Sequence, residues 1–515
     1  MYFLKNFIRK ISLLLIIYFV SRLFFFINNF SSFNINESTS WLTPFLESVR
    51  YDLSILLYIN SIVLLLIFLP FNLRLKQWYQ KIVEIVFLFV NIPFIILNNI
   101  DIEFFQYNQK RITSDFVDLL FLGNDTAQVL PSYLLTYWPI LLLTLFQIYN
   151  LFKHSDFKPK AVISNFKSFS NSLMIFLISV LFFVVGARGG LQLKPINTIN
   201  AGELSNPIFS NLILNTPFTF LHSFKSEKLV AYNYFSDQEL NNTFSLSKNY
   251  SAEKQKDYNV VIIIMESLSK EFVGFHNDHN LTPFLDSLMN HSLVFSNTYS
   301  NGLRSIEALP AITASIPTLS NTPFISSVYA QNKFNSLPSI LSKKGYASSF
   351  FHGGTRGTMG FYGFAKKAGF QKYYGLEEYD NKDDYDGTWG IYDEPFFKFF
   401  ARKLKGENQP FLSTFFSLSA HPPYNLPNHH NSRFKEGDLK IHKLITYSDY
   451  SLKVFFNSIK NEDWFNNTLF VITADHTSPK SSDSIYKNKI GRYSIPMLFY
   501  TADKSLIGID SVVTQ

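Results

Sequence analysis

Two apolar stretches of this chain each end at residues that commonly bind metal ions. Residues 260–265 form a β-branched, apolar run followed by Glu266, and residues 469–473 form a similar run followed closely by Asp475 and His476. Such runs are typical of buried strands in an open α/β sheet, in which ligands bind at the carboxyl ends of the strands. The sequence therefore predicts a metal-centred active site at one edge of such a sheet.

The predicted ligands are two carboxylates and one imidazole, from Glu266, Asp475 and His476. This set suits Zn²⁺ or Mn²⁺ better than Ca²⁺, which prefers oxygen ligands alone. Ser305 is the candidate fourth ligand and nucleophile, because a divalent cation makes a bound hydroxyl easier to deprotonate. It directly precedes a helical stretch, whose N-terminal N–H groups can bind a phosphate. Arg304 beside it can help to neutralise that phosphate.

Each of these residues has an ordinary structural explanation when it is taken alone. A Ser before a helix most often serves only as an N-cap, and Glu266 could end any strand. His352 and His421 lie at or near the ends of predicted strands 346–351 and 411–416 and are candidate substrate contacts. Taken singly, each is more often a polar strand-end residue than a ligand or a substrate contact. The functional interpretation depends on the conjunction of these residues within one predicted sheet.

The second half of the chain alternates predicted strands and helices. A helix at 281–290 and a second at 306–314 flank a predicted strand at 293–299. Strands separated by helices imply a mostly parallel, doubly wound sheet with its reactive groups along one edge. We expect this α/β catalytic domain to occupy residues 258–515.

The first half of the chain is predicted to be a membrane anchor. A membrane-spanning helix needs about 20 mainly apolar residues. Five stretches meet this requirement, at 7–27, 52–70, 82–99, 131–152 and 169–187. The first is not typical of a cleaved signal peptide, because its apolar run is long and no small-residue cleavage site follows. We therefore expect a transmembrane domain of five helices at residues 1–190, and a linker with surface helices at 191–257.

The distribution of Lys and Arg predicts how this anchor is oriented, because short loops rich in these residues stay in the cytoplasm. The expected cytoplasmic segments contain Lys5, Arg9, Lys10, Arg74, Lys76, Lys81, Lys153, Lys158, Lys160 and Lys167, against Arg50, Lys110 and Arg111 in the opposite loops. With the N-terminus inside, five crossings place the catalytic domain outside the cytoplasm, in the periplasm or the external medium.

The composition weighs against several other functions. The chain has no Cys, which excludes thiolate chemistry and a formylglycine made from Cys. The formal charge of +7 is partly explained by the cations that flank the predicted spans, so it does not indicate nucleic-acid binding. Five spans with few charges and no internal repeat give little support to a transporter.

Six motifs occur in order along the chain. They are Met265-Glu-Ser267, the segment 299–317, Phe351-His-Gly-Gly354, Trp389-Gly-Ile-Tyr-Asp-Glu394, Ala420-His-Pro-Pro-Tyr424 and Thr473-Ala-Asp-His476. Together they resemble the lipoteichoic acid synthase family of membrane phosphoglycerol transferases, within the alkaline phosphatase and sulfatase superfamily. The predicted five-helix anchor also matches this family, so the resemblance covers nearly the whole chain.

The resemblance implies one divalent cation, with Mn²⁺ favoured over Zn²⁺ or Mg²⁺, held by Glu266, Asp475, His476 and Ser305. It implies that Ser305 attacks a phospholipid donor such as phosphatidylglycerol, that diacylglycerol leaves, and that a phosphoglycerol group stays on the hydroxyl. An acceptor, either a glycan or a polyol phosphate, then takes that group. By the same resemblance, His421 matches a family residue that contacts the substrate phosphate.

The chain departs from the family pattern at several places. The best-known members have Thr where this chain has Ser305. Relatives also carry Trp-x-Arg after the turn that begins at His352, where this chain reads Gly354-Thr-Arg-Gly357. Arg356 is the candidate substitute in substrate binding, and phosphoethanolamine is the alternative donor group. The chain ends at Gln515, where relatives continue, so we expect a catalytic domain that is shortened at its C-terminus.

Alternatives to a transferase stay open at this point. Sulfatases share the fold but need a C/S-x-P-x-R motif, whereas Ser305 is followed by Ile-Glu-Ala-Leu and the Ser315-Ile-Pro-Thr-Leu319 segment lacks the Arg. A phosphodiesterase is harder to exclude, because water can replace the acceptor at the same covalent intermediate. The non-enzyme alternative is a membrane scaffold with an inactive enzyme domain, which would have no use for a buried carboxylate cluster.

Overall fold

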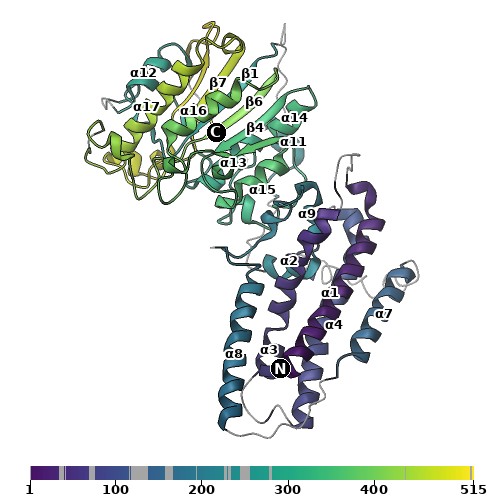
Figure 1. Ribbon diagram of the computed structural model, residues 1–515. Helices are drawn as coiled ribbons and strands as arrows, with labels where there is room; N and C mark the ends of the chain where they lie inside the picture. The colour runs from purple at the N-terminus through teal and green to yellow at the C-terminus, as the bar shows by residue number, and fades with distance from the viewer. Residues whose placement is uncertain are drawn as a thin grey trace. The chain divides into compact units, whose positions relative to one another are not determined.

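The computed structural model divides the chain into two compact units (Figure 1). The helical unit comprises Met1–Ser226 and Ser326–Lys333, and the sheet unit comprises Glu227–Ile325 and Phe334–Gln515. The structure describes residues 2–33, 40, 42–68, 73, 76–108, 110–114, 116–117, 137–156, 166–192, 194–224, 229, 233–243, 256–277, 281–434, 436–510 and 513–514.

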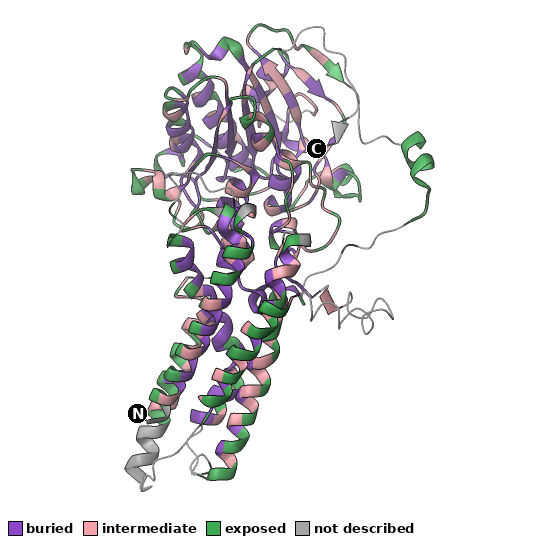
Figure 2. Cartoon of the chain, turned by 90° about the vertical axis from the view of Figure 1, so that its right-hand side faces the viewer, coloured by how far each residue is buried: buried purple, intermediate pink, exposed green. Residues whose placement is uncertain are grey.

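Long apolar helices form most of the helical unit. They are α1 (Tyr2–Asn28), α2 (Leu42–Ile59), α3 (Ser61–Phe68), α4 (Gln77–Asn108), α7 (Trp138–Lys153) and α8 (Phe166–Ala187), followed by the short α9 (Ser210–Ile213) and α10 (Thr216–Ser223). Figure 2 shows many exposed positions along the long helices, among which Phe89 is 76% and Phe182 is 73% exposed. Large apolar side chains on an outer surface are suited to contact with lipid.

The prediction of five membrane spans is wrong for these helices. Leu4–Asn28 and Gln77–Gln106 are long and apolar enough to cross a membrane, and α2 with α3 adds a third span only if this pair, bent by 61°, counts as one. Helix α7 has 16 residues, and part of the span expected at 131–152 lies outside the described residues. Among the residues of α8 whose side chains the structure describes, Leu173–Ala187 form an apolar helix of fewer than 18 residues. Two to three apolar helices therefore indicate membrane anchoring.

The break between α2 and α3 explains part of this correction. It lies at Asn60, whose Nδ2 donates to the carbonyl of Leu56 and to Oδ1 of Asn91, at 2.9 and 3.0 Å. Hydropathy counts apolar residues, but a span needs a continuous helix that rises about 1.5 Å per residue. A bend at a single residue is therefore invisible to the apolar count over residues 52–70.

Residues after the last long helix belong to the core of the helical unit. Ile196, Phe209, Leu212 and Phe218 are all buried there. Arg22 of α1 donates to the carbonyl of Leu212 at 2.8 Å. The part of the expected linker that the structure describes up to residue 224 is thus packed against the long helices, while the domain boundaries at 190 and 257 stay predictions.

The sheet unit is built around eight strands. In spatial order they are β5 (Lys372–Tyr374), β4 (Ala347–His352), β6 (Phe411–Phe416), β1 (Asn259–Met265), β7 (Thr468–Ala474), β8 (Met497–Thr501), β2 (Leu293–Phe295) and β9 (Gly508–Asp510). All neighbours pair in parallel except β8, which is antiparallel to β7 and to β2. The prediction of a mostly parallel sheet is confirmed. A separate two-stranded sheet pairs β3 (Thr298–Tyr299) with β10 (Val513–Thr514).

Helices cover both faces of the large sheet. They are α12 (Pro283–Met289), α13 (Ser305–Ala314), α14 (Leu337–Ser342), α15 (Phe361–Ala368), α16 (Asp393–Leu404) and α17 (His442–Ile459), whereas the short α11 (Asp237–Thr243) has no buried residue. Alternate residues of β1, namely Val261, Ile263 and Met265, join the apolar core that contains α16 and α17. The intervening Ile262 and Ile264 are buried as well, so β1 is covered on both faces, as a doubly wound sheet requires.

Candidate metal centre and active site

The two apolar runs of the sequence are neighbouring strands in the middle of the sheet. Strand β1 pairs in parallel with β7, and the register sets Met265 opposite Ala474. The next residue on each strand is therefore a carboxylate, Glu266 on one and Asp475 on the other. Because parallel strands end at the same edge of a sheet, this register delivers both carboxylates to one place.

Ser305 completes this cluster from the first turn of α13. Its Oγ donates to Glu266 Oε2 at 3.2 Å and lies 3.2 Å from His476 Nε2. The cap residue of the helix is Arg304, so Ser305 is the first helical residue and its hydroxyl is not used as the N-cap. The structure thus brings together the four residues that the sequence singles out, Glu266, Ser305, Asp475 and His476, and all four are buried.

The hydrogen bonds of His476 orient its ring for metal binding. Nδ1 lies 2.8 Å from the carbonyl of Thr477, which can only accept, so Nδ1 carries the proton. Nε2 therefore presents a lone pair, 3.1 Å from Asp475 Oδ2 and 3.8 Å from Glu266 Oε1. A ligating histidine whose other nitrogen is fixed by a carbonyl is the usual arrangement around a metal.

The charges of this cluster are not balanced by protein groups. Asp475 is fully buried, and its Oδ2 has no hydrogen-bond partner among the described residues. Burial raises the pKa of Glu266 well above its usual range, and the negative charge of Asp475 raises it further. One ligand atom from each of Glu266, Asp475 and His476 lies within 4.8 Å of the others. A divalent cation would supply the missing positive charge, so this donor set fits a metal site.

Ser267 holds both carboxylates and was not among the predicted site residues, although it belongs to the Met265-Glu-Ser267 motif. Its N–H donates to Asp475 Oδ1 at 2.8 Å, and its hydroxyl donates to Glu266 Oε1 at 2.7 Å. It adopts a φ of 55°, in the left-handed region that non-glycine residues rarely occupy. Each bond occupies one oxygen of a carboxylate, which leaves Glu266 Oε2 toward Ser305 and Asp475 Oδ2 toward His476.

Two side chains from a neighbouring loop lie close to the cluster. Burial lowers the pKa of His421, and the charges of Asp475 and His476 also act on this ring. The ring packs on Trp389 with centroids 3.9 Å apart, and its Nδ1 lies 3.1 Å from the carbonyl of Pro422. Tyr424 was not predicted; burial raises its pKa and the charge of Glu266 raises it further.

Two of the three remaining predicted substrate contacts are arginines that bind other protein groups. Arg304 has a half-exposed side chain and donates to Glu307 and to the carbonyl of Asn321. Arg356 pairs with Glu378 and lies over the ring of Tyr362, 5.1 Å from its centroid. Both guanidinium groups are thus engaged by other protein groups, and their substrate roles stay predictions.

His352 is buried at the end of β4. Its Nδ1 has no hydrogen-bond partner among the described residues, and its ring lies 5.0 Å from that of Phe361. Burial lowers its pKa to about 3, and the nearby His421 lowers it further. The structure therefore places His352 next to His421, and its role in substrate binding also stays a prediction.

A second group of residues in the described chain has the composition of a metal site but a different charge balance. Glu394, His429 and His430 come within ligand distance of one another. However, Glu394 Oε1 already accepts from Lys398 at 2.7 Å, and its Oε2 lies 2.6 Å from His430 Nε2. Because its charge is compensated by Lys398, this carboxylate has much less need of a cation than Glu266 or Asp475.

The sheet unit is similar to proteins of known families. The Sulfatase family profile matches residues 258–508. Lipoteichoic acid synthase 2 of Bacillus subtilis is 26% identical over 245 residues, which cover 45% of this chain and 37% of that protein. Phosphoglycerol transferase I of Salmonella arizonae is 30% identical over 259 residues, covering 46% of this chain and 33% of that protein. The match therefore spans about a third of the length of these relatives.

A solved structure of a protein in the alkaline phosphatase superfamily from Vibrio parahaemolyticus is also similar. It has a TM-score of 0.46 and 26% sequence identity, and the match covers 51% of this chain and 64% of that one.

Proposed function

We propose, from the premise that residues 258–508 form a sulfatase-superfamily domain distantly homologous to the lipoteichoic acid synthases and to phosphoglycerol transferase I, that this chain is a membrane-anchored phosphotransferase. It transfers a phosphoglycerol-type group from a phospholipid to an acceptor outside the cytoplasm, through a covalent intermediate on Ser305. The observation that carries this proposal is the convergence of the Ser305 hydroxyl with Glu266 and His476, each at 3.2 Å.

One divalent cation belongs to the proposal, and Glu266, Asp475, His476 and Ser305 would hold it. When bound, it would favour the deprotonated form of a ligating hydroxyl and offset the negative charge of a phosphate. Mn²⁺ is favoured by the family resemblance, with Zn²⁺ or Mg²⁺ as alternatives. The protein contributes fixed positions for these ligands, because Ser267 and the carbonyl of Thr477 orient them.

The chemical steps follow from the position of Ser305. Its Oγ forms a bond to phosphorus of the donor phosphodiester, the bond from phosphorus to the diacylglycerol oxygen breaks, and diacylglycerol leaves with a proton. A phosphoglycerol group then remains on Ser305. The hydroxyl of an acceptor attacks the same phosphorus, the bond to Oγ breaks, and Ser305 regains its proton. Both steps conserve the phosphodiester, so neither an oxidant nor an energy-rich cofactor is needed.

His421 is the proposed contact for the reacting groups. Since the carbonyl of Pro422 accepts from Nδ1, the neutral ring presents its Nε2 as an acceptor. Its pKa lies below the usual range, so this neutral form dominates near pH 7. A neutral imidazole beside the cluster can accept a proton from the acceptor hydroxyl as that hydroxyl attacks.

The proposed donor is phosphatidylglycerol, and the proposed acceptor is a glycan or a polyol phosphate. Because Arg356 is paired with Glu378, phosphoethanolamine stays the alternative donor group. Hydrolysis is the alternative outcome at the same intermediate. The extracytoplasmic location is part of the proposal: an odd number of crossings, such as three when α2 and α3 together form one span, would set the sheet unit opposite a cytoplasmic N-terminus.

The decisive experiment replaces Ser305 with Ala in the full-length protein. We expect phospholipid turnover to fall by about three orders of magnitude or more, because the nucleophile of the covalent step is lost. Mass spectrometry of wild-type protein quenched during turnover should find an adduct on the peptide that contains Ser305, and its mass identifies the donor group.

The matched control is Ser287→Ala, at an exposed position of α12, which should keep full activity. Cation binding by the Ser305→Ala protein should persist, since three ligands remain. Undiminished turnover in Ser305→Ala would refute the assignment of the nucleophile. Release of free glycerol phosphate without any acceptor product would favour the hydrolase.

A further inference from the structure

Trp389 lies in a loop that connects two neighbouring ends of the large sheet. The next residue, Gly390, forms an antiparallel bridge with Gly354, shortly after the end of β4. A Cβ at Gly390 would lie 2.3 Å from the carbonyl oxygen of Gly353, so this close approach of two backbones requires a glycine. The side chain of Trp389 contacts the segment after β6 that contains His421.

The backbone of this loop is held by Asp386. Its Oδ1 accepts the N–H groups of three successive residues, at 2.7, 2.7 and 3.1 Å, which are Thr388, Trp389 and Gly390. The N–H of Asp386 donates to the carbonyl of Gly390 at 2.8 Å and closes the turn. An Asp side chain that accepts from the backbone of its own turn fixes that turn. The indole of Trp389 is therefore attached to a backbone with a defined conformation.

Trp389 makes two contacts with the segment of His421. The indole Nε1–H donates to the carbonyl of Pro422 at 2.7 Å. The indole ring also packs on the imidazole of His421, with centroids 3.9 Å apart and an angle of 49° between the planes. The first contact fixes the carbonyl beside the imidazole, and the second restricts rotation of the imidazole itself.

The carbonyl of Pro422 decides which nitrogen of His421 carries the proton in the neutral ring. It lies 3.1 Å from Nδ1 and can only accept, so Nδ1 is the protonated nitrogen. An indole N–H can only donate, so this one carbonyl accepts from both rings with its two lone pairs. If the carbonyl lost its bond to Trp389 and turned toward water, the proton of His421 would be free to occupy either nitrogen.

We propose that Trp389 is a positioning residue for the transfer reaction. It holds the carbonyl of Pro422 and the ring of His421 so that Nε2 of His421 keeps its lone pair for the reacting groups. This role rests on the proposed function, in which His421 accepts the proton of the acceptor hydroxyl. A residue that fixes the tautomer of a general base affects the rate of the chemical step and has little effect on substrate affinity.

The first test measures the tautomer of His421 and needs no turnover. Full-length protein with ring-¹⁵N-labelled histidine is studied in detergent at mildly alkaline pH by long-range ¹H–¹⁵N correlation, and His421→Gln identifies the His421 signals. We expect protonation at Nδ1 alone in the wild type. Trp389→Phe keeps an aromatic ring but lacks the N–H, and it should give a mixture of both tautomers. The matched control is Trp78→Phe, at an exposed position of α4, which should leave the spectrum unchanged.

The second test measures phospholipid turnover by the same variants. Trp389→Phe should lower kcat about tenfold, which is the effect of one lost hydrogen bond, and should leave KM within about twofold. Trp389→Ala should lower kcat further, because the packing on His421 is lost as well. If Trp389→Phe does not fold, Asp386→Ala decides, since it releases the turn that carries the indole and should produce the same mixture of tautomers.

Protonation of His421 at Nδ1 alone in the folded Trp389 variants would overturn the proposal. Unchanged kcat together with a mixture of tautomers would overturn the role of Trp389 in the reaction. Failure of the proposed function is distinguishable from both results. Undiminished turnover in Ser305→Ala, or no phospholipid turnover in the wild type, would refute that function, whereas the tautomer is measured in the resting protein and does not depend on turnover.

Discussion

The residues of the Ser305 cluster make an unusual set for the interior of a protein. Glu266 and Asp475 are both buried and close together, and one oxygen of Asp475 has no partner among the described residues. Two uncompensated carboxylates in a low-dielectric site are strongly unfavourable, and a bound cation would offset their charge. Cation binding would therefore explain a local arrangement that otherwise reduces stability.

His352 gives a prediction about pH that concerns a single residue. Its folded-state pKa is about 3, whereas an unfolded histidine has a pKa near 6.5. Between these values the unfolded chain binds a proton at this residue and the folded chain does not. Stability should therefore fall as pH decreases below about 6.5, with a contribution of up to about 1.4 kcal/mol per pH unit.

Unfolding by urea at several pH values between 7 and 4.5 measures this slope. His352→Phe, which keeps an aromatic ring beside Phe361 but cannot titrate, should flatten the dependence. The same substitution at the exposed His291 is the control. A slope that is unchanged in His352→Phe would show that this residue does not cause the acid sensitivity.

At the scale of elements, the pairing of β1 with β7 is what creates the site. Neither strand is long, but their register sets Glu266 and Asp475 side by side at the end of the sheet. Helix α13 then begins at Ser305 and faces its first side chain toward them. The chemistry is thus assembled from three chain segments whose ends meet at one edge.

A buried carboxylate that joins two helices gives a prediction at this scale. Asp449 of α17 accepts the N–H groups of Phe284 and Leu285 in the first turn of α12, at 3.0 and 2.8 Å. Asp449→Ala would leave these two donors without partners, at a cost of about 1–3 kcal/mol in the free energy of unfolding. Denaturant unfolding checks this value.

Asp449→Asn provides the comparison for this prediction. Burial raises the pKa of Asp449 to about 7, so a neutral side chain that still offers an oxygen should cost clearly less than Ala. Asp380→Ala, at an exposed position, should have almost no effect. Equal losses for Ala at both positions would contradict the role of Asp449 in joining these helices.

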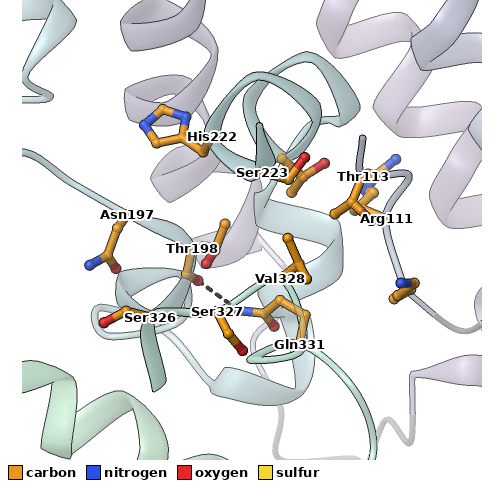
Figure 3. Close-up of a pocket in the computed structure, with 12 residues that line it drawn as sticks. Arg111, Thr113, Asn197, Thr198, His222, Ser223, Ser326, Ser327, Val328 and Gln331 are labelled. Carbon is orange, nitrogen blue, oxygen red and sulfur yellow. Dashed lines mark hydrogen bonds between the residues drawn. The ribbon is translucent and has the colours of Figure 1, made fainter. Parts of the chain in front are cut away.

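At the scale of the whole molecule, the chain forms two compact units that each have a hydrophobic core. The division does not follow the sequence order, because Ser326–Lys333 belongs to the helical unit while the chain on either side belongs to the sheet unit. Gln331 illustrates how this segment is joined to the helical unit, because Ser210 Oγ donates to Gln331 Oε1 at 2.9 Å. Gln331 Nε2 in turn donates to the carbonyl of Thr198 at 2.7 Å (Figure 3).

Removal of the cation should affect one unit and spare the other. We expect calorimetry of the detergent-solubilised protein to show two unfolding transitions, of which EDTA lowers only that of the sheet unit. A ligand at 100 times its dissociation constant stabilises the folded state by about 2.7 kcal/mol, so the shift should be several degrees.

The control for this experiment is Asp475→Asn, which removes the ligand whose Oδ2 lacks a partner and should abolish the response to cation. Chelation that lowers neither transition, or both equally, would show that the cation does not bind within the sheet unit alone.

The sequence by itself determined the residues of the cluster and the class of the sheet. Apolar runs that stop at Glu266 and before Asp475 predict strand ends, and strands that alternate with helices predict parallel pairing, because these are local patterns of hydrophobicity. The pattern also placed the proposed nucleophile at the start of a helix, where the structure has Ser305.

Only the tertiary structure decided which side chains are available to that cluster. Ser267 holds both carboxylates, Arg304 is engaged by Glu307, and Asn60 ends a helix that hydropathy predicted to be continuous. These features depend on contacts or backbone turns at single residues. Such features produce no periodic pattern of hydrophobicity in the sequence. The apolar pattern reports how much surface a segment buries, whereas the partner of each polar group depends on which distant segment the fold brings beside it.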